Sequence, residues 1–146
     1  MHATVAREEL PVAISLAAGK GDAQAVAAWL NEGGGVDARS AELKGATLLM
    51  GAAGGGQEAL VRMLLQRGAG VNLQNPLGLT ALMGAAISGH ITIVQALLDA
   101  KADASLQSNQ GRTALTFAEQ QKHQKHTATA QLLRQHAKRQ AAEAEA

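Results

Sequence analysis

The stretch Gly78–Leu98, GLTALMGAAISGHITIVQALL, decides the fold because it holds two short helical patterns separated by a glycine. Thr80 precedes the first pattern, where its hydroxyl can accept a hydrogen bond from an unpaired backbone N–H at a helix start. Gly89 stands where the first helix must stop and reverse, a place that favours a left-handed residue. The apolar residues that follow have helical spacing: Ile93, Val94, Leu97 and Leu98. The stretch therefore predicts a helix, a short turn and a second helix.

The same unit recurs along the chain. The openings Gly45–Met50 (GATLLM) and Gly111–Thr116 (GRTALT) match Gly78–Met83 (GLTALM), so the period is 33 residues. A single unit cannot bury its apolar face alone, and such units therefore stack on their neighbours. A degenerate first unit matches the second at a spacing of 35 residues, which predicts two extra residues between Arg39 and Lys44. A fourth unit carries two inserted residues within the stretch 120–127.

The pattern G-x-T-x-L-x-x-A-A-x-x-G-H-x-x-I-V-x-x-L-L, read from Gly78 to Leu98, resembles the ankyrin repeat. The resemblance implies an all-α ankyrin-repeat solenoid of about four stacked helix-turn-helix units with projecting hairpin-like loops. Residues 1–146 would form one domain, with a degenerate N-terminal repeat at about 8–39 and a C-terminal capping repeat at about 108–139. The two middle repeats would span about 42–74 and 75–107, and residues 140–146 would be a polar tail.

One departure from the family pattern affects the backbone. Lys101 replaces the glycine that usually ends the second helix. We expect this lysine to be left-handed, at a cost of roughly 1 kcal/mol.

Composition and charge narrow the classes of function. The chain has 146 residues, 13 Lys+Arg against 12 Asp+Glu, and no cysteine. A net charge of +1 gives no electrostatic reason to expect nucleic acid as the main partner, and the absence of cysteine removes thiol nucleophiles, thiolate zinc sites and thiol redox switching. The sequence contains no apolar run of the kind that a signal peptide or a membrane span needs. It predicts a soluble cytoplasmic protein, with the nucleus left open and no membrane partner.

Two glycine-rich segments and a histidine pair are candidates for ligand chemistry. Residues 33–38 and 54–59 both fit G-x-G-x-x-A, but a dinucleotide site needs a preceding strand, so we interpret these glycines as helix stops. His123 and His126 can begin a zinc site, yet only Glu119 lies near them in the sequence to complete it. Neither H-E-x-x-H nor G-x-S-x-G occurs in the sequence. We expect no catalytic residue, no metal and no cofactor.

The C-terminal segment is basic. Residues 122–146 contain five basic and two acidic side chains, a local charge of +3 that leaves the rest of the chain at −2. The segment has no aromatic residue on which bases could stack. We interpret it as a polar capping helix that frays into a tail after about Arg139. Binding of metal or nucleic acid by this basic, histidine-containing helix remains an alternative.

The resemblance also implies where a partner binds. Similar proteins hold partners at loop tips and on the exposed side of the first helices. Leu77, Leu79 and Ile87 are large apolar residues at such positions, and contiguous exposed apolar area usually marks an interaction site. The alternative is that Leu77 and Leu79 only pack on neighbouring loops. The candidate partner-binding residues are Leu43, Lys44, Pro76, Leu77, Leu79, Ile87, Ser88, Asn109, Gln110, Arg112 and Gln120.

These observations together predict a non-enzymatic protein–protein interaction module or scaffold. The expected partner is a protein or peptide, and we expect the chain to be a monomer. The alternative is a structural or inhibitory subunit that self-associates through the apolar residues of the third repeat.

Overall fold

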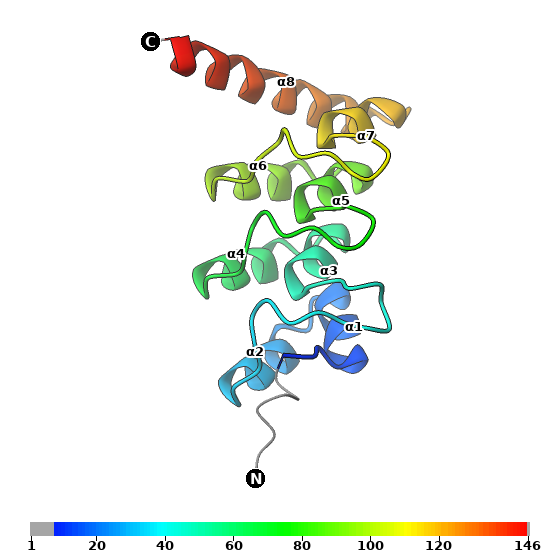
Figure 1. Ribbon diagram of the computed structural model, residues 1–146, viewed down its shortest axis with the longest axis vertical. Coiled ribbons are helices and arrows are strands. Elements are labelled where there is room, and N and C mark those ends of the chain that lie inside the picture. Colours follow the sequence, from blue (N-terminus) through cyan, green and yellow to red (C-terminus); the bar gives the residue numbers. More distant parts are fainter. Residues whose placement is uncertain (1–7, 146) are drawn as a thin grey trace.

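The computed structural model describes residues 8–145, and within this range the chain forms eight α-helices in four successive pairs (Figure 1). Residues 1–7 and 146, which the predicted domain includes, lie outside the described residues. The helices are α1 (Val12–Lys20), α2 (Ala23–Asn31), α3 (Leu48–Gly54), α4 (Glu58–Gln66), α5 (Ala81–Ser88), α6 (Ile91–Asp99), α7 (Ala114–Gln120) and α8 (Gln124–Glu145).

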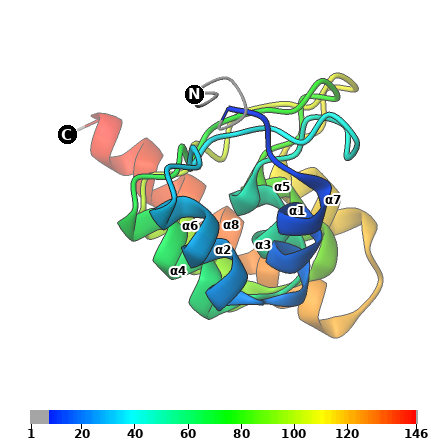
Figure 2. The same ribbon diagram turned by 90° about the horizontal axis from the view of Figure 1, so that it is seen from below.

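The pairs stack into a solenoid. The first helices pack in sequence, α1 on α3, α3 on α5 and α5 on α7, and form one column. The second helices lie beside them, and the loops between pairs project together to one side of both columns (Figure 2). The fold is thus the all-α repeat solenoid that the sequence predicts.

Threonines and glycines set the helix boundaries, as predicted. The hydroxyls of Thr47, Thr80 and Thr113 accept hydrogen bonds from the backbone N–H three residues onward, at 3.3, 3.2 and 3.3 Å. Each such cap is worth about 1 kcal/mol. Gly56 and Gly89 have φ values of 76° and 72°, so they make the left-handed turn between the helices of a pair.

The column of first helices is built on small side chains. Alanines occupy the contacts between successive first helices and allow the backbones to approach closely, while leucines from both columns fill the space between them. The fully buried alanines of this column are Ala18, Ala52, Ala53, Ala85 and Ala86.

The two extra residues predicted in the first loop widen its tip. In the third and fourth repeats the tip is closed by a backbone hydrogen bond spanning four residues, from Asn75 to Leu79 and from Ser108 to Arg112. In the second repeat the corresponding bond joins Ser40 to Ala46 and spans six residues. Leu43 and Lys44 both lie in this wider tip.

Side chains tie each loop to the next one. The Arg39 guanidinium donates to the Gln74 carbonyl at 3.1 Å, and the Gln74 amide donates in turn to the Gln107 carbonyl at 3.0 Å. Nearer the helices, the side-chain oxygen of Asn72 accepts from the backbone N–H of Asp103 at 2.7 Å. The loops therefore form a connected layer rather than independent projections.

Two lysines have left-handed backbones. Lys101 has a φ of 72°, which confirms the expectation drawn from its position after the second helix of the third repeat. Lys44 has a φ of 56°, which the sequence reasoning did not foresee. Both positions lie in turns where glycine would avoid the steric cost.

The predicted tail is helical. Helix α8 continues six residues beyond Arg139, to Glu145, so the expectation of a frayed polar tail from residue 140 is wrong within the described range. Alanine, glutamine and glutamate are strong helix formers, and they extend a helix that Leu133 anchors in the core. Residues 137–145 are nevertheless all exposed, and Figure 1 shows this end of α8 reaching past the column of second helices.

The two helices of the last pair are joined by residues 121–123, which fall within the stretch predicted to hold the insertion. The Arg134 guanidinium meets the Glu119 carboxylate at 2.6 Å and links α8 to α7. None of the helices within residues 8–145 has both the length and the apolar character needed to cross a membrane.

Candidate functional site

A small pocket, here called the apolar pocket, opens between the third and fourth repeats and has a volume of about 290 Å³. Its walls come from the loop tips before α5 and α7, from the end of α5 and from α7. The structure therefore brings together five of the predicted partner-binding residues, and it adds Ser108 and Phe117. The full lining is Leu77, Leu79, Ile87, Ser108, Asn109, Gln110 and Phe117.

Phe117 explains why the pocket lies at this joint. The period of 33 residues places it in register with Gly51 and Gly84, which face the preceding first helix. A Cβ added at Gly51 would lie 3.7 Å from the Cβ of Ala18, and one at Gly84 would lie 3.8 Å from the Cα of Gly54. Those joints leave no room for a ring. Only between α5 and α7 does an aromatic side chain occupy this position, and it forms one wall of the pocket.

The three apolar residues singled out in the third repeat differ in exposure. Leu79 is partly buried and packs against the hydrophobic core, so packing accounts for an apolar residue at this position. Leu77 is 50% exposed and Ile87 is partly exposed, and neither belongs to the core cluster. Leu77 thus presents apolar surface to solvent at the mouth of the pocket.

Hydrogen bonds hold the loop tip around the pocket. The side-chain oxygen of Asn75 accepts from the backbone N–H groups of Leu77 and Leu79 at 3.0 and 2.9 Å. Asn109 donates from its backbone to the Leu77 carbonyl at 2.9 Å and from its side-chain amide to the Pro76 carbonyl at 2.6 Å. These bonds fix the relative position of the two tips, so the pocket is preformed. They also give Asn109 and Pro76 a structural part in the loop layer.

The remaining candidate residues surround the pocket at greater distance. Lys44 and Gln120 are exposed, and Arg112 is partly exposed. Leu43 is 37% exposed in the wider second tip and does not line the apolar pocket. Ser88 points the other way: its hydroxyl donates to the Gly54 carbonyl at 3.2 Å and closes the end of α3.

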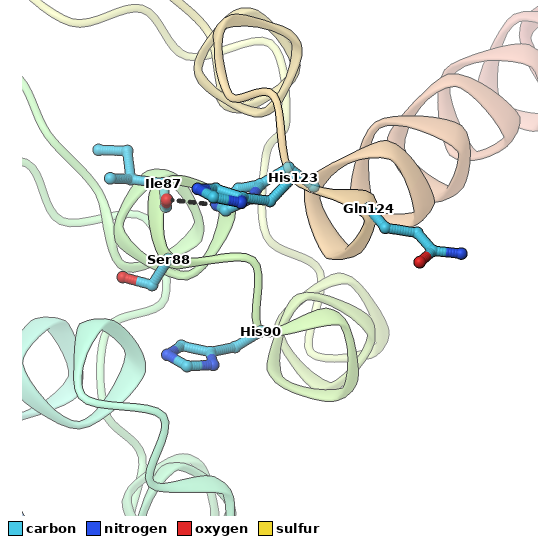
Figure 3. Close-up of a pocket in the computed structure, with 6 residues that line it drawn as sticks. Ile87, Ser88, His90, His123 and Gln124 are labelled. Carbon is cyan, nitrogen blue, oxygen red and sulfur yellow. Dashed lines mark hydrogen bonds between the residues drawn. The ribbon is translucent and has the colours of Figure 1, made fainter.

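A second and more open hollow lies next to the apolar pocket and shares Ile87 with it (Figure 3). It is lined by Ile87, Ser88, His90, His123, Gln124 and His126. In Figure 3 the Gln124 side chain points away from the other residues, and the dashed line joins a histidine ring to the carbonyl of Ile87. We call this hollow the histidine-lined hollow.

The histidines of this hollow have structural environments. His126 is buried, and its Nε2–H donates to the Ile87 carbonyl at 2.7 Å, leaving Nδ1 buried without a hydrogen-bond partner. The His123 ring lies 5.8 Å from the His126 ring, centroid to centroid, and is exposed. Among the described residues, no group of three or more His, Cys, Asp or Glu side chains is placed to hold a metal ion. The zinc alternative raised by His123 and His126 thus finds no ligand set in residues 8–145.

Two carboxyl groups have a lowered pKa, and both lie away from the apolar pocket. Hydrogen bonds from the Thr92 and Arg62 side chains lower the pKa of Glu58. Hydrogen bonds from the Ser105 hydroxyl and then from its backbone N–H lower the pKa of Asp103. These hydrogen bonds favour the carboxylate form of both groups. Neither residue lines the apolar pocket, so neither supplies a proton-transfer group to it.

The glycine-rich segments also follow helices rather than strands. Gly33 comes two residues after the end of α2 and has a φ of 104°, and Gly56 comes two residues after the end of α3. They are helix stops, as interpreted.

Phe117 and Ser108 are the pocket residues that sequence reasoning missed. Phe117 lies on a first helix, where an apolar residue is expected to be part of the hydrophobic core. A signal was nevertheless present, because the aligned repeats have glycine at the same position. Ser108 is 8% exposed, and its hydroxyl accepts from the backbone N–H groups of Gln110 and Arg112 at 3.3 Å each.

Comparison with known proteins gives one family. The family profile described as "Ankyrin repeats (3 copies)" matches residues 14–108 and 49–143, which together cover most of the chain. A comparison with curated proteins gave no match.

Proposed function

The chain belongs to the ankyrin-repeat family, whose members generally bind proteins, and we propose that it is a non-enzymatic module that binds a protein or peptide at the apolar pocket. The binding surface comprises the loop tips and the first helices of the third and fourth repeats. The observation that carries the proposal is a preformed pocket with an exposed leucine at its mouth. Leu77 leaves half of its surface in water while the loop tip that holds it is fixed by hydrogen bonds.

Physical chemistry supports a binding role for this arrangement. Burying an exposed leucine side chain is worth about 1.5–3 kcal/mol. The loop tips are already ordered by the bonds of Asn75 and Asn109, so binding does not have to order them. An apolar anchor point in a preformed hollow is a typical centre of binding energy in protein interfaces.

The test compares three proteins for affinity capture from a lysate of the source cell. The first is the wild type, and the second carries Leu77→Glu and Ile87→Glu. The third carries Leu16→Glu and Ile91→Glu, which places the same charges at apolar residues that are 49% and 39% exposed outside the proposed surface. Circular dichroism first establishes that all three are folded.

Proteins retained by the wild type and the Leu16/Ile91 variant, but lost by the Leu77/Ile87 variant, would support the proposed surface. Retention of the same proteins by all three would refute it. Sedimentation of the purified wild type over a range of concentrations tests the alternative function, self-association. A mass that rises with concentration for the wild type, but not for the Leu77/Ile87 variant, would favour self-association over a separate partner.

A further inference from the structure

The size of the apolar pocket limits what enters it. Its volume of about 290 Å³ has room for a large side chain such as Leu, Met or Phe. It is at the lower end of the range for ligand pockets, too small for a folded surface or a large cofactor. The occupant therefore contributes one apolar anchor, and the rest of it must lie across the surrounding loop tips and helices.

The unpaired charge on the elements that form the pocket walls is positive. Residues 75–88 and 108–120 carry two formal charges, those of Arg112 and Glu119, and the Glu119 carboxylate is paired with Arg134 at 2.6 Å. The Arg112 side chain forms no ion pair within the described residues. On the other side of the pocket, the second loop tip carries Lys44, which is exposed and likewise without an ion pair in the described chain. Glu42 is the one carboxylate on this tip, so the positive potential on the Lys44 side of the pocket is weaker than that on the Arg112 side.

The repeat register fixes how far these cations lie from the pocket. Lys44 is in register with Leu77, and Arg112 is in register with Leu79, each displaced by one repeat in opposite directions. Arg112 lies on the loop tip of the fourth repeat, the tip of Ser108 and Gln110 that itself lines the pocket, whereas Lys44 lies one repeat before the tip of Leu77. Neighbouring packed helices are about 8–10 Å apart, so one repeat on the Lys44 side is a step of about that length along the stack. An extended peptide advances about 3.3 Å per residue, and this distance therefore corresponds to about three residues.

We infer that the partner of the apolar pocket is an extended acidic peptide segment with one large apolar side chain, an Asp or Glu about three positions away on the Lys44 side, and a second one closer to it on the Arg112 side. The apolar side chain enters the pocket beside Leu77 and Phe117. One carboxylate meets the Arg112 guanidinium, whose planar fork suits bidentate pairing, and the other meets the Lys44 ammonium. The inference rests on the proposed function and adds the chemistry of the ligand to it.

Arg112 should contribute more than Lys44. The sequence neighbours of Arg112 on its loop tip, residues 108–111, are uncharged, whereas Glu42 lies two residues from Lys44 and offsets part of its field. Arginine also pairs with carboxylates through two parallel hydrogen bonds, which a lysine cannot do. The carboxylate on the Arg112 side of the anchor is thus the stronger of the two requirements.

The test uses a phage-displayed library of random dodecapeptides selected on the purified full-length chain. Enrichment of peptides with a single large apolar residue and acidic residues on both sides of it, one of them about three positions away, is expected. The affinity of one enriched peptide, labelled with fluorescein, is then measured by fluorescence anisotropy. Replacing its apolar anchor by Ala should weaken binding about thirtyfold, as burial of that side chain predicts.

Charge reversals separate the two parts of the inference. Arg112→Glu should weaken binding of the labelled peptide by about tenfold, the loss of a charge-assisted hydrogen bond, and Lys44→Glu should weaken it less. Lys101→Glu is the matched control, since Lys101 is an exposed lysine with a left-handed backbone, like Lys44, but lies just after the end of α6 and does not line the apolar pocket. This control should leave the affinity unchanged.

The outcomes are distinct. Enriched peptides that lack acidic residues but lose affinity for the Leu77/Ile87 variant would overturn the inferred ligand chemistry and keep the proposed function. Enriched peptides that bind the Leu77/Ile87 variant as tightly as the wild type would overturn both, as would a selection that enriches no sequence. Equal weakening by the Arg112 and Lys101 reversals would show that only overall charge matters, which contradicts the inferred placement of the carboxylates.

Discussion

The Nε2–H of His126 donates to the carbonyl oxygen of Ile87 over 2.7 Å, and this bond joins the start of α8 to the end of α5. The last carbonyls of a helix have no partner within the helix, so a buried side chain that reaches one of them stabilises the helix end. The residue so held is the one that lines both the apolar pocket and the histidine-lined hollow.

Replacing His126 should therefore be costly. His126→Ala leaves the Ile87 carbonyl unpaired and a cavity behind it, and we expect the free energy of unfolding to fall by about 2 kcal/mol. His123→Ala is the control because His123 is exposed three residues away, and its effect should stay within about 0.5 kcal/mol. Urea denaturation followed by circular dichroism measures both. Equal effects of the two substitutions would contradict a special part for His126.

The left-handed backbone of Lys101 predicts a stabilising substitution. Lys101→Gly removes the steric strain of a Cβ at φ 72° and should raise the free energy of unfolding by about 1 kcal/mol. For a chain of this length that is a rise in Tm of about 3 °C. Lys101→Ala removes the charge but keeps the Cβ, so its Tm should not rise. Calorimetry that finds the same gain for both would assign the effect to charge instead of strain.

Neighbouring glycines at the end of α3 should respond in opposite directions. A Cβ at Gly54 would meet nothing within 4 Å, so Gly54→Ala should stabilise the chain by about 1 kcal/mol through helix propensity. A Cβ at Gly55 would lie 2.4 Å from the Gly19 carbonyl oxygen, so Gly55→Ala must push α3 away from α1 and should destabilise. Chemical denaturation of the two variants tests the pair. Fluorescence of Trp29, the only tryptophan, shows whether the first repeat unfolds with the rest.

The free end of α8 should contribute little to stability. Deleting residues 140–146 removes a helix end whose residues are exposed from 140 to 145, and the free energy of unfolding should change by less than about 0.5 kcal/mol. Leu133→Ala, on the buried part of the same helix, should cost about 3 kcal/mol. Thermal melts of the two proteins give the comparison. A large loss on truncation would mean that the end of α8 supports the stack in a way that its exposure does not indicate.

The fold was predictable because its determinants are local and repeated. Thr47, Thr80 and Thr113 mark helix starts through bonds to residues three positions onward, and Gly56 and Gly89 mark turns through their own backbone angles. None of these depends on contacts between distant parts of the chain. The extent of α8 was not predicted, because the polar sequence after Arg139 is as compatible with a tail as with a helix that an anchored segment extends.

The candidate site was predictable only in part. Leu77 and Ile87 stood out as apolar residues at positions where exposure was expected. The pocket itself depends on a contact between two repeats, and a pattern read within one repeat does not show it. Phe117 and His126 take part in such contacts between repeats, because each lies against α5 from a later repeat. The insertion within residues 120–127 also shifts the 33-residue register, so the sequence does not show which histidine reaches the Ile87 carbonyl.

The glycine-to-phenylalanine difference at position 117 has an evolutionary consequence. Because the joints between first helices are otherwise built alike, gene duplication or loss of a repeat upstream of α5 would lengthen or shorten the array without altering the pocket. The two repeats that form the pocket would then be retained together. The specificity of the pocket could be inherited by arrays of different length, with only the placement of Lys44, one repeat before the pocket, open to change.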